Sequence, residues 1–226
     1  ALPISILMVL FIQAFRFAAE PFFFAEYEKS NAREIFARVM KIFVIICMTI
    51  FLGIMLFMDV VQYFIGRDFR VGLEIVPVLL VAHVFLGIYF NLSIWYKLTG
   101  KTQYGAWITL IGAFITVSLN LILIPVWGYH GAAWVHLVCY TTMAVVSYFW
   151  GQRHFPVPYD VAKVLLIIMF GVMIYLLYSL MPDLANMLDW IVRGLLILLF
   201  WGTIVIVDKE ARELFVAGIN FLKLKR

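Results

Sequence analysis

The sequence predicts an all-α fold, a polytopic transmembrane helix bundle with about seven spans. Of the 226 residues, 65% are hydrophobic and 13% are charged, whereas soluble domains carry about 25% charged residues. Seven apolar stretches are long enough to cross a membrane, since a helix needs about 20 mostly apolar residues to span a hydrocarbon core of about 30 Å. Lys and Arg gather in alternate connections between these stretches, which is the pattern of a multi-pass membrane protein.

The predicted spans, in order, are residues 1–25, 41–64, 73–96, 104–124, 132–150, 162–181 and 188–207. Residues 31–34 are similar to a capping box and open an amphipathic helix that leads into the second span. Turn-forming residues at 99–102 and 125–131 predict tight hairpins between the third, fourth and fifth spans. The tail from residue 208 mixes apolar with basic residues, which predicts a helix on the membrane surface.

The distribution of basic residues predicts the orientation of the bundle. Thirteen Lys and Arg residues lie in the first, third and fifth connections and in the C-terminal tail, and two lie in the second connection. Because positive charge favours the cytoplasmic side, we expect the odd connections and the C-terminus to be cytoplasmic and residue 1 to be extracytoplasmic. The net charge of +4 therefore indicates topology and contact with membrane lipids, with no nucleic-acid partner.

An odd number of spans that starts outside, with no signal segment before it, leads us to expect an upstream half of the protein. Cys47 and Cys139 fall within apolar stretches, which favours packing roles over a disulfide or a metal site. The sequence contains no phosphate-binding glycine loop, nucleophile motif or zinc signature. It therefore indicates no catalytic residue, no metal and no cofactor.

The first span carries three polar residues on one helical face. Gln13, Arg16 and Glu20 are three and four residues apart, so Arg16 and Glu20 can form an ion pair at i, i+4. Pro21 follows directly and favours a kink beside this pair. Charges within a span are costly, by about 2.5–3.5 kcal/mol each, and usually face a water-filled pathway; a purely structural ion pair is the alternative.

Three later spans also carry polar or small residues at helical spacing. The third contains His83 and Asn91, the fourth contains Asn120, and the fifth contains His136 and Tyr140. These stripes have two open interpretations, a cavity lining or a face for close helix packing. For the two histidines, interior side chains with satisfied hydrogen bonds are the simpler interpretation. The stripes predict that spans one, three, four and five surround a shared interior surface, with spans six and seven outside.

Several of these segments resemble one known family. The runs at residues 15–24 (FRFAAEPFFF), 91–97 (NLSIWYK) and 120–125 (NLILIP), the last followed by Gly128 and Gly131, resemble bacterial oligosaccharide flippases. These are the polysaccharide biosynthesis proteins of the multidrug/oligosaccharidyl-lipid/polysaccharide exporter superfamily. The likeness extends from the first span to about residue 160, and its paired-glycine turn is common across the superfamily.

The resemblance implies one lobe of a two-lobed membrane transporter that is not an enzyme. Residues 1–160 would form the five-helix core of the C-terminal lobe, residues 161–207 two additional peripheral helices, and residues 208–226 a cytoplasmic amphipathic basic tail. Family members move undecaprenyl-pyrophosphate-linked oligosaccharide, a polysaccharide or lipopolysaccharide precursor, across the bacterial inner membrane by alternating access. The implied partners are this lipid-linked oligosaccharide, membrane lipids and an N-terminal lobe.

The resemblance also implies roles for the polar residues of the spans. Arg16 is expected to hold the pyrophosphate, because a guanidinium stays charged and can donate two hydrogen bonds to phosphate oxygens. Glu20 is expected to be its counter-ion when the site is empty. The other candidate substrate-binding residues are Gln13, Asn91, Asn120, His136 and Tyr140.

Three alternative functions remain at this stage. In a cation-coupled small-molecule or drug exporter of the same superfamily, Glu20 would titrate or bind the coupling ion. A membrane enzyme acting on a lipid-linked glycan would need clustered carboxylates or histidines near one interface, and the acidic residues Asp59, Asp68 and Glu74 lie instead among loop arginines. A scaffold within a glycan-assembly complex is the third alternative.

Overall fold

The computed structural model describes residues 2–64, 67–182, 186–208 and 212–213. Every regular element in these ranges is helical, which confirms the all-α prediction, and six of the helices are long and apolar enough to cross a membrane. The elements are α1 (Leu2–Glu26), α2 (Ala32–Leu56), α3 (Met58–Val61), the 3-10 helices η1 (Gln62–Phe64) and η2 (Arg67–Ile75), α4 (Val76–Leu92), α5 (Ile94–Leu98), α6 (Gln103–His154), α7 (Val161–Ser179) and α8 (Asn186–Val207).

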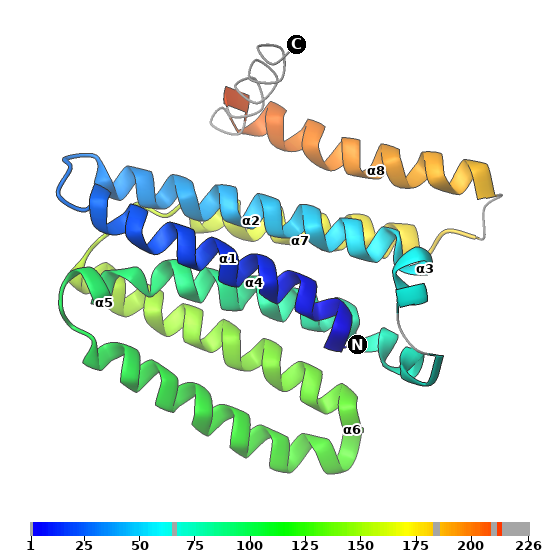
Figure 1. The fold of residues 1–226 in the computed structure, drawn as a ribbon, viewed down its shortest axis with the longest axis horizontal. Helices are drawn as coiled ribbons and strands as arrows, with labels where there is room; N and C mark the ends of the chain where they lie inside the picture. The colour runs from blue at the N-terminus through cyan, green and yellow to red at the C-terminus, as the bar shows by residue number, and fades with distance from the viewer. Residues whose placement is uncertain (1, 65–66, 183–185, 209–211, 214–226) are drawn as a thin grey trace. The chain divides into compact units, whose positions relative to one another are not determined.

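The longest helix, α6, contains two of the predicted spans. At 1.5 Å per residue its 52 residues would reach about 78 Å if straight, more than twice the hydrocarbon thickness. The helix instead doubles back, and Figure 1 shows its two green arms side by side. The predicted seven-residue turn is reduced to Gly128, whose φ of 54° and ψ of −134° interrupt helical geometry. The arms approach so closely that a Cβ on Gly131 would lie 2.6 Å from the Leu123 carbonyl oxygen.

The second span begins earlier than its predicted limits. The expected amphipathic helix and the span form one continuous helix, α2, because no glycine or proline separates them before Gly53. Phe36 and Met40, on the predicted apolar side, are buried. The helix ends at Leu56, eight residues before the predicted limit, and short helical turns fill the connection to α4.

The described residues divide into two compact units. Unit 1 comprises residues 1–40 and 58–159, and unit 2 comprises residues 41–57 and 160–226, so that α2 contributes to both. The four spans that were expected to share an interior surface correspond to α1, to α4 with α5, and to the two arms of α6, and all of these lie in unit 1. There α4 packs against α6 and α1, with Ile12, Leu80 and Ile108 fully buried.

Unit 2 is formed by α7, α8 and the second part of α2. Its core contains Met48, Phe51 and Phe200, all inaccessible to solvent. A Cβ on Gly171 would lie 2.6 Å from the terminal carbon of Met48, so this glycine allows close approach of α7 and α2. The aromatic side chain of Tyr175 packs edge-on against Phe51, with ring centroids 5.8 Å apart.

Ion pairs in unit 2 provide partners for two basic residues, Lys41 and Arg193. The pattern of spans places Lys41 in a connection and leaves Arg193 isolated within a span. The buried Lys41 Nζ donates to Asp208 Oδ2 at 2.7 Å, which joins α2 to the residue that follows α8. Arg193 on α8 pairs with Asp189, and its Nε donates to the Tyr178 hydroxyl at 2.9 Å. Both pairs therefore have a structural role. The predicted surface helix at 208–226 lies mostly outside the described residues.

Candidate functional site

The polar face of α1 forms the ion pair that its spacing predicts. Arg16 Nε donates to Glu20 Oε1 at 3.1 Å, one helical turn away. The helix continues through Pro21 to Glu26. Both charged side chains are about one-third exposed, so the pair by itself contributes little stability, as is usual for solvated ion pairs.

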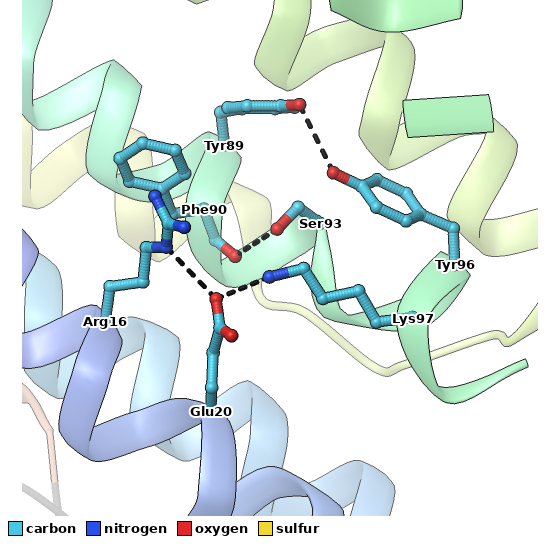
Figure 2. A network of polar contacts seen from close by, with 7 residues as sticks. All are labelled: Arg16, Glu20, Tyr89, Phe90, Ser93, Tyr96 and Lys97. Carbon is cyan, nitrogen blue, oxygen red and sulfur yellow. Dashed lines mark hydrogen bonds and ion pairs between the residues drawn. The ribbon is translucent and has the colours of Figure 1, made fainter. Parts of the chain in front are cut away.

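A second cation, Lys97, reaches the same carboxylate from another helix. Its Nζ donates to Glu20 Oε1, the oxygen that also accepts from Arg16. Figure 2 shows Arg16 and Lys97 converging on Glu20 from α1 and α5. The direction of Lys97 depends on a local interruption, because the helical run breaks at Ser93, between α4 and α5. The hydroxyl of Ser93 donates to the Phe90 carbonyl at 2.7 Å at this break.

The guanidinium of Arg16 lies over an aromatic ring. Its central carbon is 4.8 Å from the centroid of Phe90 on α4, a distance at which cation–π attraction is effective. Among the described residues, Arg16 forms no hydrogen bond or ion pair other than the one with Glu20. The four N–H donors on Nη1 and Nη2 are therefore open to water or to a ligand.

This cluster of Arg16, Glu20 and Lys97 carries two positive charges and one negative charge. Because Glu20 Oε1 is shared between both cations, an incoming anion with several oxygens could replace it on each of them. A planar guanidinium offers paired donors and an ammonium offers a compact charge. The arrangement therefore suits a phosphate or diphosphate group.

The two asparagine candidates lie elsewhere in unit 1. Asn91 is buried, and its Nδ2 donates to the Gly87 carbonyl at 3.0 Å on its own helix. The Oδ1 atoms of Asn91 and Asn120 are buried without a hydrogen-bond partner in the described part of the chain. Gln13, on the polar face of α1, is half-buried and is not among these buried unpartnered atoms. Unpartnered buried amides of this kind require water or a ligand.

His136 and Tyr140 form a separate group with His83. The Tyr140 ring is near both histidine rings, with its centroid 6.2 Å from that of His83 and 5.7 Å from that of His136. His136 Nδ1 bonds to the Ala132 carbonyl at 2.8 Å, as an interior histidine should, whereas His83 Nδ1 has no hydrogen-bond partner within the described ranges. Within those ranges, no hydrogen bond, ion pair or ring contact joins this group to Arg16.

Lys97 is the site residue that the sequence interpretation missed, because it was assigned to the third connection and to the run at residues 91–97 but not to the candidate binding residues. A usable signal was present. The first and third spans cross the membrane in the same direction, so their C-terminal ends lie at the same side. Glu20 and Lys97 are both near those ends, and a carboxylate within a span calls for a cation at that depth.

The described residues hold no group of three His, Cys, Asp or Glu side chains that could bind a metal ion. Cys47 and Cys139 are buried free thiols, and Cys139 Sγ accepts from the Thr116 hydroxyl at 3.3 Å. Comparison of the chain with protein-family models, curated proteins and solved structures finds no significant match. The family resemblance therefore stays a prediction from the residues.

Proposed function

We propose that this chain is the C-terminal lobe of a flippase-type transporter that moves undecaprenyl-pyrophosphate-linked oligosaccharide across the bacterial inner membrane by alternating access. The observation that carries the proposal is the sharing of Glu20 by Arg16 and Lys97 within the spans. Two cations on different helices match a diphosphate, whose negative charge is spread over two linked phosphoryl groups.

The carboxylate of Glu20 occupies the position that the pyrophosphate would take. In the empty site it satisfies both cations and lowers the cost of keeping them in a span. When the lipid-linked substrate binds, its phosphate oxygens replace Glu20 on Arg16 and Lys97. The exchange is possible because all three side chains are a quarter to a third exposed, so they are not sealed in dry packing.

The remaining candidates would act away from the pyrophosphate. Asn91, Asn120, His136 and Tyr140 would contact the sugar or take part in gating, and Gln13 would extend the polar face of α1. The unpartnered amide oxygens of the two asparagines support such contacts, because buried polar atoms need partners. In this proposal residue 1 is extracytoplasmic and the C-terminus is cytoplasmic.

The charge of the cluster weighs against the closest alternative. In a cation-coupled exporter, Glu20 would have to bind a proton or metal cation. Both of its positively charged neighbours already share its Oε1 atom, and a site with net positive charge repels a further cation. The same arrangement attracts an anion, which favours the lipid pyrophosphate as the ligand.

Glycan export by variants of the full-length protein tests the proposal. We expect Arg16→Ala and Lys97→Ala each to reduce export strongly, with the double variant losing little more, because both act on one ligand. Lys101→Ala is the matched control, since Lys101 is an exposed lysine four residues further along the chain. Normal export by Arg16→Ala and Lys97→Ala, with normal protein levels, would refute the assignment.

A further inference from the structure

The connection between α1 and α2 forms a pocket that the proposed function does not use. Its volume is about 410 Å³, within the range of about 300–1,000 Å³ typical of small-molecule sites. The residues that line it include Tyr27, Lys29, Ser30, Arg33, Glu34 and Phe155. All of them belong to unit 1.

The pocket lies where three candidate spans end. One span ends at Glu26, the next begins at Ala32, and the third ends at His154, directly before Phe155. Span ends mark the depth of lipid headgroups, where aromatic rings with polar neighbours are enriched. Tyr27 packs against Phe155 with ring centroids 5.6 Å apart, which fixes one wall of the pocket at this depth.

One cation that lines the pocket, Arg33, lies against an aromatic ring and has no carboxylate partner among the described residues. The Arg33 guanidinium lies 5.1 Å from the centroid of Phe155, and within the described ranges no ion pair joins it to an acidic residue. Phe155 is itself buried and contacts Phe36, whose side chain is almost fully inaccessible. The stacked guanidinium therefore has a supported face and free N–H edges, the arrangement in which arginine receives phosphate.

The other polar side chains of the pocket complete a set for a zwitterion. Lys29 Nζ donates to Glu26 at 2.7 Å and retains two further N–H donors. The hydroxyls of Tyr27 and Ser30 have no hydrogen-bond partner in the described part of the chain, and neither has the carboxylate of Glu34. Donors for a phosphate thus lie beside one free acceptor for an ammonium group.

We propose that this pocket binds the headgroup of a phospholipid with a primary amine, as in phosphatidylethanolamine. The phosphate contacts Arg33 and Lys29, and the ammonium group donates to Glu34. Phosphatidylcholine cannot donate these hydrogen bonds, because its nitrogen carries only methyl groups. Phosphatidylglycerol has no cation for Glu34. The site is independent of the Arg16 cluster, so either assignment can fail without the other.

Native mass spectrometry of the purified, delipidated full-length protein tests the proposal, with the three lipids titrated at matched acyl length. We expect phosphatidylethanolamine to bind most tightly. Arg33→Ala should weaken its binding about 10- to 100-fold, the value of a charge-assisted hydrogen bond of about 1.5–3 kcal/mol. Glu34→Gln should remove the preference for phosphatidylethanolamine over phosphatidylcholine while preserving phosphate binding.

Lys101→Ala is the control for general loss of positive charge and should bind as the unmodified chain does. Arg33→Lys keeps the charge but loses the planar guanidinium, so its affinity for phosphatidylethanolamine should lie between those of Arg33→Ala and Lys101→Ala. Circular dichroism checks that each variant is folded. Equal binding by folded Arg33→Ala and Lys101→Ala would overturn the site. Equal affinity for all three lipids would overturn the role of Glu34. Displacement of the lipid by inorganic phosphate at similar concentration would show a soluble-phosphate site and overturn the lipid assignment.

Discussion

Replacement of Glu20 by Gln separates a counter-ion from a residue that binds substrate. If Glu20 occupies the cations in the empty site, its neutral analogue should make a diphosphate bind more tightly. Glu20 contacts both Arg16 and Lys97, and all three side chains are a quarter to a third exposed. Exposed ion pairs contribute about 0.2–1 kcal/mol each. Loss of the two ion pairs that the diphosphate must displace therefore favours its binding by about 1 kcal/mol. This corresponds to roughly fivefold tighter binding.

Isothermal titration of a short-chain, water-soluble isoprenyl diphosphate into the full-length protein measures this effect. Arg16→Ala should weaken diphosphate binding and Glu20→Gln should strengthen it. The corresponding isoprenyl alcohol, which has no phosphate, should bind to none of these proteins through this site. The gain should shrink as salt is added, because solvated charges are screened. Weaker diphosphate binding by Glu20→Gln, similar to that of Arg16→Ala, would refute the counter-ion role.

Two further predictions concern stability, each measured by SDS-induced unfolding followed by circular dichroism. Lys41→Met leaves the Asp208 carboxylate buried without its main partner and should lower the free energy of unfolding by about 3–5 kcal/mol. The loss is smaller if Lys163, 4.0 Å from the same oxygen, takes over the ion pair. The double variant Lys41→Met, Asp208→Leu should recover most of this stability. Gly128→Ala should cost about 1–3 kcal/mol because its backbone conformation is nearly restricted to glycine, whereas Gly53→Ala, within α2 and without near neighbours, should be neutral or stabilising. Unchanged unfolding in Lys41→Met, or equal effects at the two glycines, would contradict these arguments.

Hydropathy predicted the order of the apolar segments well because each needs the same run of apolar residues. It predicted about seven spans, whereas six helices are long and apolar enough to cross a membrane, because α6 contains two of the predicted segments. It predicted the limits of the spans less well where helix formation and membrane insertion follow different rules. In α2, an amphipathic segment and an apolar span share one helix, since nothing in the chain before Gly53 interrupts backbone hydrogen bonding. In α6, one glycine reverses the chain, and the expected loop residues on both sides remain helical.

The partners of charged residues were harder to predict because some of them are far apart in the sequence. The i, i+4 pair of Arg16 and Glu20 follows from helical geometry alone. Lys97 joins them from 77 residues away, and Lys41 finds Asp208 from 167 residues away. No local sequence pattern specifies such pairs. The alternating direction of successive spans limits which helix ends can lie on the same side, and tertiary packing decides which of these ends are in contact.

The position of Arg16 relates the physics of the membrane to the proposed role. A central Arg costs about 2.5–3.5 kcal/mol on insertion scales. The contact with Phe90 stabilises Arg16 by about 0.5–2 kcal/mol. The partly exposed ion pair with Glu20 contributes up to about 1 kcal/mol more. These contacts offset much of the cost, yet they satisfy only one of five N–H donors. Acyl chains would leave the other four unsatisfied at a cost of several kcal/mol. The open side of Arg16 therefore has to face water or an anion, which is the condition that a pathway for a phosphorylated lipid supplies.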